Sequence, residues 1–190
     1  MHILGISGSL RSGSFNTRAL RAAQLLVPEG SELDIHTLHD IPLYNADLES
    51  EGIPESVVAF REAVVGADAV LICTPEYNYS VPGVLKNALD WLSRSGGKPL
   101  DGKPVGIMGA SPGRLGTARA QYHLRQVLVN FNACVLNRPE VMISGAHEAF
   151  DEKGAFSNER TAEIVQKQLQ ALVDLADQLE PATSVASGSV

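Results

Sequence analysis

The chain has 190 residues, of which 44% are hydrophobic and 19% charged, and these values are typical of one globular domain with a sizeable core. Its net charge of −7 argues against a nucleic-acid-binding surface, which needs clustered Lys and Arg. No apolar run has the length of a membrane span, and the N-terminus does not show a signal-peptide pattern, so we expect a cytoplasmic protein with no membrane partner.

Five predicted strands alternate with five predicted helices. The strands are apolar or alternating runs at 1–7, 32–38, 69–74, 103–110 and 133–136. The helices have apolar faces bounded by Pro or Gly, at 15–27, 54–65, 82–94, 117–130 and 158–179. This alternation predicts an α/β fold with a five-stranded parallel sheet in the order 2-1-3-4-5 and helices on both faces.

The remaining segments are predicted without regular structure. Residues 40–54 form a long polar loop, either functional or a solvated linker, and 137–157 are irregular. We expect residues 1–180 to form one domain and the small, polar stretch 181–190 to be a disordered tail. Cys73 and Cys134 lie in apolar runs and are interpreted as buried free thiols. The histidines are scattered, so no metal site is predicted.

The most informative stretch, residues 5–17, lies between the first strand and the first helix. Its glycines let the backbone approach a ligand closely, and its serines offer hydroxyl donors, with Arg11 as the single cation. The helix that begins near 14–16 directs unpaired N–H groups and its positive dipole end at this loop. These features predict a phosphate-binding loop, and an ordinary strand-to-helix turn with an N-cap is the alternative.

The residue types and their spacing in this stretch exclude three familiar phosphate-binding loops. The kinase-type loop needs a lysine after its glycines, which is not present here. The dinucleotide motif needs G-x-G-x-x-G, which Gly5, Gly8 and Gly13 do not match. A phosphatase loop would carry a nucleophilic cysteine, which this stretch lacks. We therefore expect the loop to hold a phosphate without cleaving it.

Two further loops are expected at the same edge of the sheet. Ligands of such sheets bind beyond the carboxyl ends of strands one and three, where 7–16, 75–80 and 111–116 meet. The second loop offers backbone groups to the edge of a flat ring, with Tyr77 beside it, and the glycines of the third allow close approach. A phosphate and a planar polar ring together predict a mononucleotide, most naturally FMN. Alternatively, the tyrosines are interface aromatics and Arg114 is a solvated charge.

Two sequence blocks resemble the NADPH-dependent FMN reductase family. They are Gly-Ser-Leu-Arg-Ser-Gly-Ser-Phe-Asn at 8–16 and Pro-Glu-Tyr-Asn-Tyr-Ser-Val-Pro-Gly-Val-Leu-Lys-Asn-Ala-Leu-Asp-Trp at 75–91. The likeness continues through 111–121, and the whole of it spans most of the chain. The resemblance implies a flavodoxin-like fold, bound FMN, a homodimer or homotetramer, and reductase activity toward flavins, quinones, azo dyes or chromate.

The resemblance also assigns candidate FMN-binding residues. Those implied to bind the phosphate are Arg11, Ser14, Phe15 and Asn16, with Ser9 close by. Those implied to bind the isoalloxazine ring are Pro75, Glu76, Tyr77 and Asn78. The third loop adds Ser111, Gly113 and Arg114. No catalytic side chain is predicted, because the cofactor carries the chemistry, and we expect Glu76 to act through its backbone.

The implied reaction passes hydride from NADPH or NADH to flavin N5. A quinone, flavin, azo compound or metal oxyanion then takes the electrons at the same exposed ring face, which predicts ping-pong turnover. A flavodoxin-like electron carrier without NAD(P)H activity is the alternative, and the acidic net charge suits docking to basic partners. A regulatory or scaffold protein that keeps a flavin only for stability is a third possibility.

Two predicted helices carry more apolar surface than one face of a sheet needs. The apolar residues of helix 82–94 are Leu85, Ala88, Leu89, Trp91 and Leu92. Those of helix 117–130 are Tyr122, Leu124, Val127 and Leu128. We therefore expect self-association through these helices, and the alternative is that both stripes simply cover the sheet.

Overall fold

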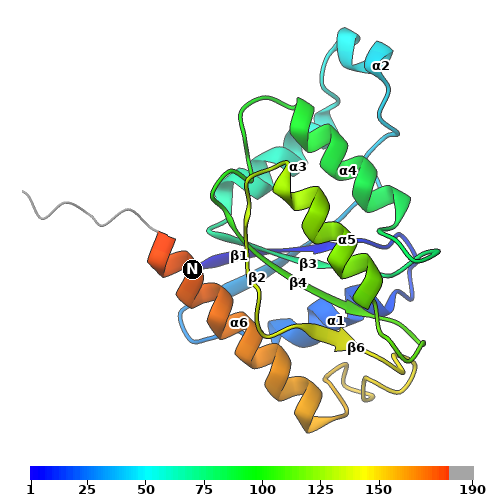
Figure 1. Cartoon of the computed structure of the whole chain (residues 1–190), viewed down its shortest axis with the longest axis vertical. Coiled ribbons are helices and arrows are strands. Elements are labelled where there is room, and N and C mark those ends of the chain that lie inside the picture. Colours follow the sequence, from blue (N-terminus) through cyan, green and yellow to red (C-terminus); the bar gives the residue numbers. More distant parts are fainter. Residues whose placement is uncertain (180–190) are drawn as a thin grey trace, which may run out of the picture.

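The computed structural model describes residues 1–179, so the predicted tail at 181–190 lies outside the described residues. A parallel sheet in the order β2-β1-β3-β4-β5 forms the centre of the molecule, which confirms the predicted topology (Figure 1). Its strands are β1 His2–Ser7, β2 Glu32–Thr37, β3 Ala69–Cys73, β4 Pro104–Ala110 and β5 Cys134–Val135. A further short strand, β6 Val141–Ile143, pairs with β4.

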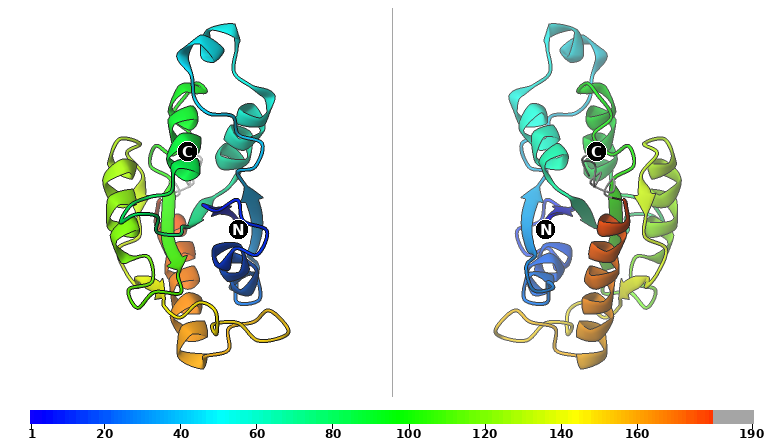
Figure 2. Two further views of the ribbon diagram at one scale, coloured as in Figure 1. Left: turned by 90° about the vertical axis from the view of Figure 1, so that its right-hand side faces the viewer. Right: turned by 90° about the vertical axis from the view of Figure 1, so that its left-hand side faces the viewer.

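Helices cover both faces of the sheet (Figure 2). In chain order they are α1 Phe15–Gln24, α2 Ala46–Glu51, α3 Glu55–Gly66, α4 Gly83–Arg94, α5 Ala118–Val129 and α6 Glu159–Leu179. One apolar layer joins α1 and α6 to the sheet, and the other joins α3, α4 and α5 to the opposite face. Every residue of β3 is fully buried between these layers, as its unbroken apolar sequence predicts.

Helix α1 ends at Gln24, three residues before the end that the apolar pattern predicts. The N–H groups of Leu25 and Leu26 donate to the carbonyls of Ala22 and Ala23, so the last turn tightens to i→i−3 bonding. Local hydrogen bonding, rather than apolar periodicity, therefore sets this boundary.

The long loop at 40–54 contains helix α2, so the prediction of an irregular loop was wrong there. Asn45 caps the helix by accepting the N–H of Asp47 at 2.9 Å, but no residue of α2 is buried. A helix without a buried face has no apolar period, and none was visible in the sequence. The segment is fixed to α4, where Asn87 and Trp91 both donate to the carbonyl of Pro42 at 2.8 Å.

The predicted fifth strand, 133–136, corresponds to β5, and the structure adds a second short strand, β6, along the same edge of β4. Strand β5 pairs with the first residues of β4, and β6, inside the segment predicted as irregular, pairs with the last ones. Between them, the side-chain amide of Gln168 donates to the carbonyls of Ile107 and Pro139 at 2.9 and 3.0 Å. Strand β6 ends at Ile143, and the carbonyl of Ile143 accepts the N–H of Ser111 at 2.9 Å.

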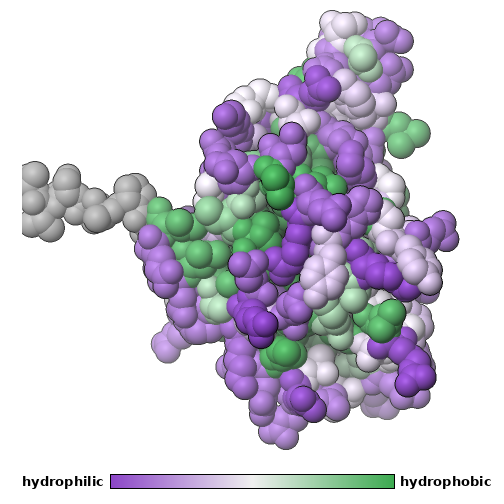
Figure 3. All heavy atoms as spheres, in the orientation of Figure 1, coloured by the Kyte–Doolittle hydropathy of each residue, from purple (hydrophilic) through white to green (hydrophobic). Residues whose placement is uncertain are grey.

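Three surface expectations change with the structure. The five apolar residues predicted to form the stripe of α4 are buried within the chain, and the one other apolar residue of this helix, Val84, is half-buried, so the stripe does not form an exposed apolar face. On α5, Leu124 and Leu128 are buried, whereas Tyr122 is exposed, and Figure 3 shows apolar patches scattered among polar residues on this side. Cys73 is buried as expected, but Cys134 is only half-buried.

Within residues 1–179, no helix has the length and apolarity needed to cross a membrane.

Candidate functional site

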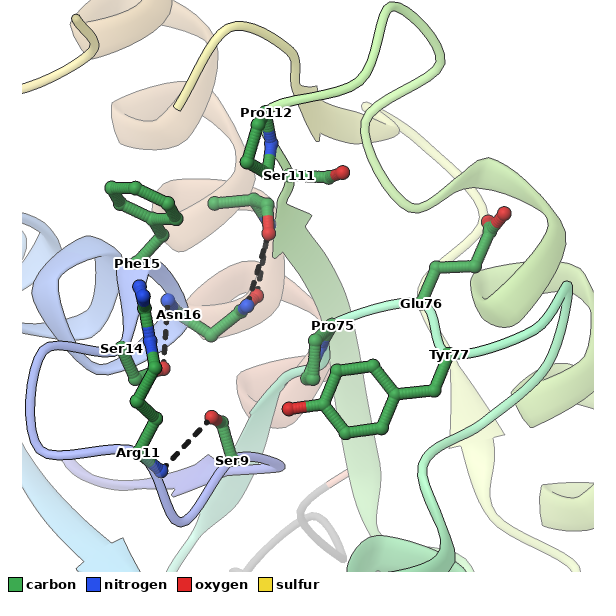
Figure 4. Close-up of a pocket in the computed structure, with 11 residues that line it drawn as sticks. Ser9, Arg11, Ser14, Phe15, Asn16, Pro75, Glu76, Tyr77, Ser111 and Pro112 are labelled. Atoms are coloured by element: carbon green, nitrogen blue, oxygen red, sulfur yellow. Dashed lines mark hydrogen bonds between the residues drawn. The ribbon is translucent and has the colours of Figure 1, made fainter. Parts of the chain in front are cut away.

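A cavity of about 270 Å³ lies beyond the carboxyl ends of β1, β3 and β4, where ligands of such sheets bind (Figure 4). The predicted residues of the first loop all line it, together with Pro75, Glu76, Tyr77 and Ser111. Asn78, Gly113 and Arg114 are not among the lining residues. The lining also includes Ala110 and Pro112, which sequence reasoning missed although they flank Ser111 at the end of a predicted strand.

The first loop presents the start of α1 to the cavity. Ser14 is the N-cap of α1, and its Oγ accepts the N–H groups of Asn16 and Thr17 at 3.2 and 3.3 Å. Ser9 and Ser14 are almost fully buried, and Ser9 Oγ also accepts the N–H of Arg11 at 3.4 Å. A capped helix start with hydroxyl groups beside it is a favourable environment for an anion.

Arg11 supplies the positive charge at this end of the cavity. Its guanidinium group lies over the ring of Phe15, 4.9 Å from the ring centroid, and Nη2 donates to the Gly13 carbonyl at 2.6 Å. In the part of the chain that the structure describes, Arg11 forms no ion pair with a carboxylate. Its charge is therefore available to an anionic ligand.

The side chain of Asn16 is directed at β4. Its Nδ2 donates to the Ala110 carbonyl at 3.0 Å, and its Oδ1 accepts the Ala110 N–H at 2.9 Å. Oδ1 also accepts a weak bond from the Cys73 thiol at 3.4 Å, and Asn16 is only 3% exposed. The amide thus joins the helix start to the strand that carries the third loop, as Figure 4 shows.

The carboxylate of Glu76 points away from the cavity (Figure 4). Its Oε2 accepts the N–H groups of Arg119 and Ala120, at 3.0 and 3.2 Å, at the start of α5. Oε1 forms an ion pair with the Arg119 guanidinium group, and this bond raises the pKa of Arg119. The carboxylate therefore caps α5, and the side of Glu76 that faces the cavity is its backbone.

A tight turn follows Glu76 and places the aromatic side chains. Tyr77 and Ser80 exchange two backbone hydrogen bonds of 3.1 Å, and the two residues between them, Asn78 and Tyr79, have φ values of 50° and 68°. The ring of Tyr77 is directed across the cavity, whereas Asn78 lies exposed at the tip of the turn. This position explains why Asn78 does not line the cavity.

Side chains of α5 hold the outer half of this turn. The guanidinium group of Arg119 lies 3.6 Å from the centroid of the Tyr79 ring, a cation–π contact. Ser80 Oγ and His123 Nδ1 are joined by a hydrogen bond of 2.8 Å. The loop after β3 is therefore supported by α5 on the side that faces away from the cavity.

The third loop turns outward soon after β4. Ser111 Oγ accepts the N–H of Gly113 at 3.1 Å, and both Gly113 and Arg114 are exposed. Ser111 is held from the other side by β6 and the loop after it, because the Ala146 N–H donates to the Ser111 carbonyl at 3.1 Å. The wall of the cavity is consequently formed by the first residues of the loop, Ser111 and Pro112, rather than by its glycine.

A larger cavity of about 580 Å³ lies between β6 and the start of α6. Two carboxylates, Glu140 and Glu148, line it. Such a lining disfavours an anionic cofactor, because it places negative charge beside negative charge. The smaller cavity, with Arg11 and a capped helix start, therefore has the better chemistry for a phosphate.

The sheet order and the helices on both of its faces define a flavodoxin-like fold, and the cavity lies at the topological switch point of the sheet. The sequence profile of the NADPH-dependent FMN reductases matches residues 1–148. The chain thus belongs to the NADPH-dependent FMN reductase family and is an oxidoreductase.

Several relatives span most of the chain. An NAD(P)H-dependent FMN reductase of Pseudomonas aeruginosa is 56% identical over 170 residues, which cover 90% of this chain and 92% of the relative. A quinone reductase of Escherichia coli is 51% identical over 144 residues, covering 75% and 77%. Among solved structures, the flavoenzyme NAD(P)H:(acceptor) oxidoreductase FerB of Paracoccus denitrificans superposes with a TM-score of 0.81 at 37% identity, covering 93% of this chain and 97% of that one.

Proposed function

We propose that this protein is an FMN-dependent oxidoreductase that passes electrons from NADPH or NADH to a small-molecule acceptor. The acceptor classes are quinones, flavins, azo compounds and metal oxyanions, and the names of the relatives favour the first two. The observation that carries the proposal is one cavity in which Arg11, which has no carboxylate partner within residues 1–179, meets a capped helix start at one end and Pro75, Tyr77 and Ser111 at the other.

The residues of the cavity fit FMN. Arg11, Ser9 and the start of α1 would hold the phosphate, because they combine positive charge with hydroxyl and N–H donors. The backbone of residues 75–77 and the wall at Ser111 and Pro112 would hold the flat ring. When bound, FMN supplies the hydride and electron chemistry.

The chain itself contributes orientation rather than proton transfer. Glu76 is the one carboxylate among the residues that line the cavity, and it is fully engaged with the start of α5. A group held in this way is not placed to give a proton to a substrate. We therefore assign no catalytic side chain and propose that these residues bind and position the cofactor.

Mixing the purified, FMN-loaded protein with NADPH in the absence of oxygen tests the function. A reductase should lose its yellow colour rapidly, and an added quinone should restore it. Absent or slow bleaching, with FMN bound, would instead favour an electron carrier or a protein that keeps the flavin for stability. NADH in a parallel experiment would establish the preferred nicotinamide nucleotide.

We further propose that the two substrates use one surface in turn. The first loop and residues 75–77 would hold the tail and one edge of the cofactor, and the small glycine loop after Ser111 would leave the opposite side accessible. Initial rates plotted as reciprocals should then give parallel lines at several acceptor concentrations, with each substrate inhibiting competitively at high concentration. Intersecting lines would contradict the shared surface and favour two separate pockets.

The protein is also proposed to form a homodimer or homotetramer. On α5, Tyr122 is 51% exposed and Val129 is 77% exposed, so this helix offers apolar surface that residues 1–179 do not cover. Sedimentation at micromolar concentration should show a species heavier than the 20.2 kDa chain. A single species at the mass of one chain would contradict self-association.

Two further assignments accompany this function. We propose that residues 1–180 act as one FMN-binding domain, which limited proteolysis would test by leaving a single resistant fragment. We propose a cytoplasmic location because Cys73 and Cys134 are both free thiols, which suits a reducing compartment. Cell fractionation with an antibody to the protein would check the location.

A further inference from the structure

We infer that Asn16 is a positioning residue, whose amide holds the phosphate loop and the Ser111 wall of the cavity at a fixed separation. The inference rests on the proposed function in so far as it concerns flavin binding. It assigns Asn16 a role different from the phosphate contact that the sequence resemblance implies.

The strand geometry creates the need for such a residue. Pairing between β3 and β4 ends with Cys73 opposite Met108, and the Thr74 N–H makes the last bond, to the Met108 carbonyl at 3.0 Å. Ala110 lies two residues further along β4, beyond the end of β3. Its N–H and carbonyl are buried polar groups that need partners other than β3.

The amide of Asn16 takes the place of the missing strand. It donates to the carbonyl and accepts the N–H of the same residue, Ala110, at 3.0 and 2.9 Å, which is the pairing that a neighbouring backbone would provide. Burial raises the pKa of the Cys73 thiol, so the thiol keeps its proton and donates to the same Oδ1. Three segments, the start of α1, the end of β3 and the end of β4, therefore meet at one side chain.

This arrangement couples the two ends of the cavity. Asn16 is the second residue of α1, directly after the residues that cap the helix and face the phosphate position. Ala110 and Ser111 form the wall on the ring side. A rotation of α1 or a displacement of the third loop would break the two bonds to Ala110, so the amide preorganises both ends together.

The test compares FMN with riboflavin, which has the ring but no phosphate, and follows hydrogen exchange at the Ala110 N–H in the ligand-free protein. In Asn16→Ala, exchange at Ala110 should rise on the order of 10-fold or more, because the N–H loses its partner. Affinity for FMN and for riboflavin should fall by similar factors, on the order of 10-fold, because the wall beside the ring is released.

Gln24→Ala is the matched control. Gln24 lies at the other end of α1, where its Nε2 donates to the Leu33 carbonyl at 2.7 Å, so it also ties this helix to a strand through an amide. Its removal should lower stability while exchange at Ala110 and both flavin affinities stay at the wild-type values. The comparison separates a general loss of stability from the loss of the hydrogen bonds between Asn16 and Ala110.

Asn16→Asp is a second variant in case the alanine protein does not fold. A buried carboxyl group keeps its proton to higher pH than usual, and in that form it can still donate to the Ala110 carbonyl. Riboflavin affinity should therefore be close to wild type at acidic pH and fall as the pH rises and the group ionises. The wild-type protein should not show this dependence, because an amide does not titrate.

The possible outcomes lead to different conclusions. Unchanged exchange at Ala110 in Asn16→Ala would overturn the inference, and so would loss of FMN affinity with riboflavin affinity unchanged, since that result would place the amide on the phosphate. A wild-type protein that binds neither flavin would instead refute the proposed function. Hydrogen exchange at the Ala110 N–H would still test the hydrogen bonds between Asn16 and Ala110. If riboflavin binds too weakly to titrate, the exchange result alone supports or overturns the inference.

Discussion

Replacing Gly109 by alanine is expected to destabilise the fold by about 3 kcal/mol or more and to remove tight flavin binding. Gly109 lies on β4 immediately before Ala110, between the backbone of Thr74 and the side chain of Thr117. A Cβ at this position would overlap the Thr74 carbonyl oxygen and the Thr117 hydroxyl. Neither atom belongs to the flexible end of a long side chain, so backbone must move.

That movement would be transmitted to the cavity. Thr74 precedes Pro75, which lines the cavity, and the fully buried Thr117 precedes α5, which holds the carboxylate of Glu76. Urea unfolding and FMN titration of the variant measure the two effects. Gly83→Ala is the matched control, because Gly83 starts α4 and nothing lies within 4 Å of its added Cβ. If Gly109→Ala had wild-type stability, Thr74 and Thr117 would have to be able to move away from β4 without lowering the free energy of unfolding.

The sheet could be predicted because its signal is local and repeated. The apolar run that became β3 is buried at every residue, and the loops around it contain the Gly and Pro residues that end helices and strands. Strands β5 and β6 have only two and three residues, too few to show a period of two. The segment between them is joined to β4 by Gln168, which comes from a helix distant in sequence.

The first loop of the site could be predicted for a similar reason. Every residue assigned to it lines the cavity, because a strand, a short loop and a capped helix fix one another within about a dozen residues. The second and third loops depend on distant partners. Glu76 turns to the N–H of Arg119, 43 residues later, and the positive φ of Asn78 moves that side chain to an exposed tip. Sequence reasoning had no means of locating these partners.

Asn16 illustrates the difference between a lining residue and its role. The sequence places it in the correct loop, and the structure places it at the cavity. The atoms that it contacts, however, belong to Ala110, 94 residues further along the chain. A motif therefore identifies which residues gather at a site, and the tertiary structure decides which of them face the ligand and which hold the others in place.

Replacing Arg11 by alanine is expected to weaken FMN binding about 10- to 100-fold and to leave riboflavin binding unchanged. The guanidinium group of Arg11 lies beside the capped N-terminal end of α1, and it forms no ion pair within residues 1–179. Hydrogen bonds to a charged group contribute about 1.5–3 kcal/mol, which corresponds to this range of affinity. Riboflavin lacks the phosphate, so its affinity does not depend on this charge.

Two variants separate the specific contact from the general loss of one positive charge. Arg21→Ala removes the same charge from the last turn of α1, away from the cavity, and should leave FMN affinity near the wild-type value. Arg11→Lys keeps the charge but loses the planar pair of donors, so it should bind FMN with intermediate affinity. Equal losses of FMN and riboflavin affinity in Arg11→Ala would mean that Arg11 shapes the cavity. Unchanged FMN affinity would place the phosphate elsewhere, because Arg11 is the one cation among the described residues that line this cavity.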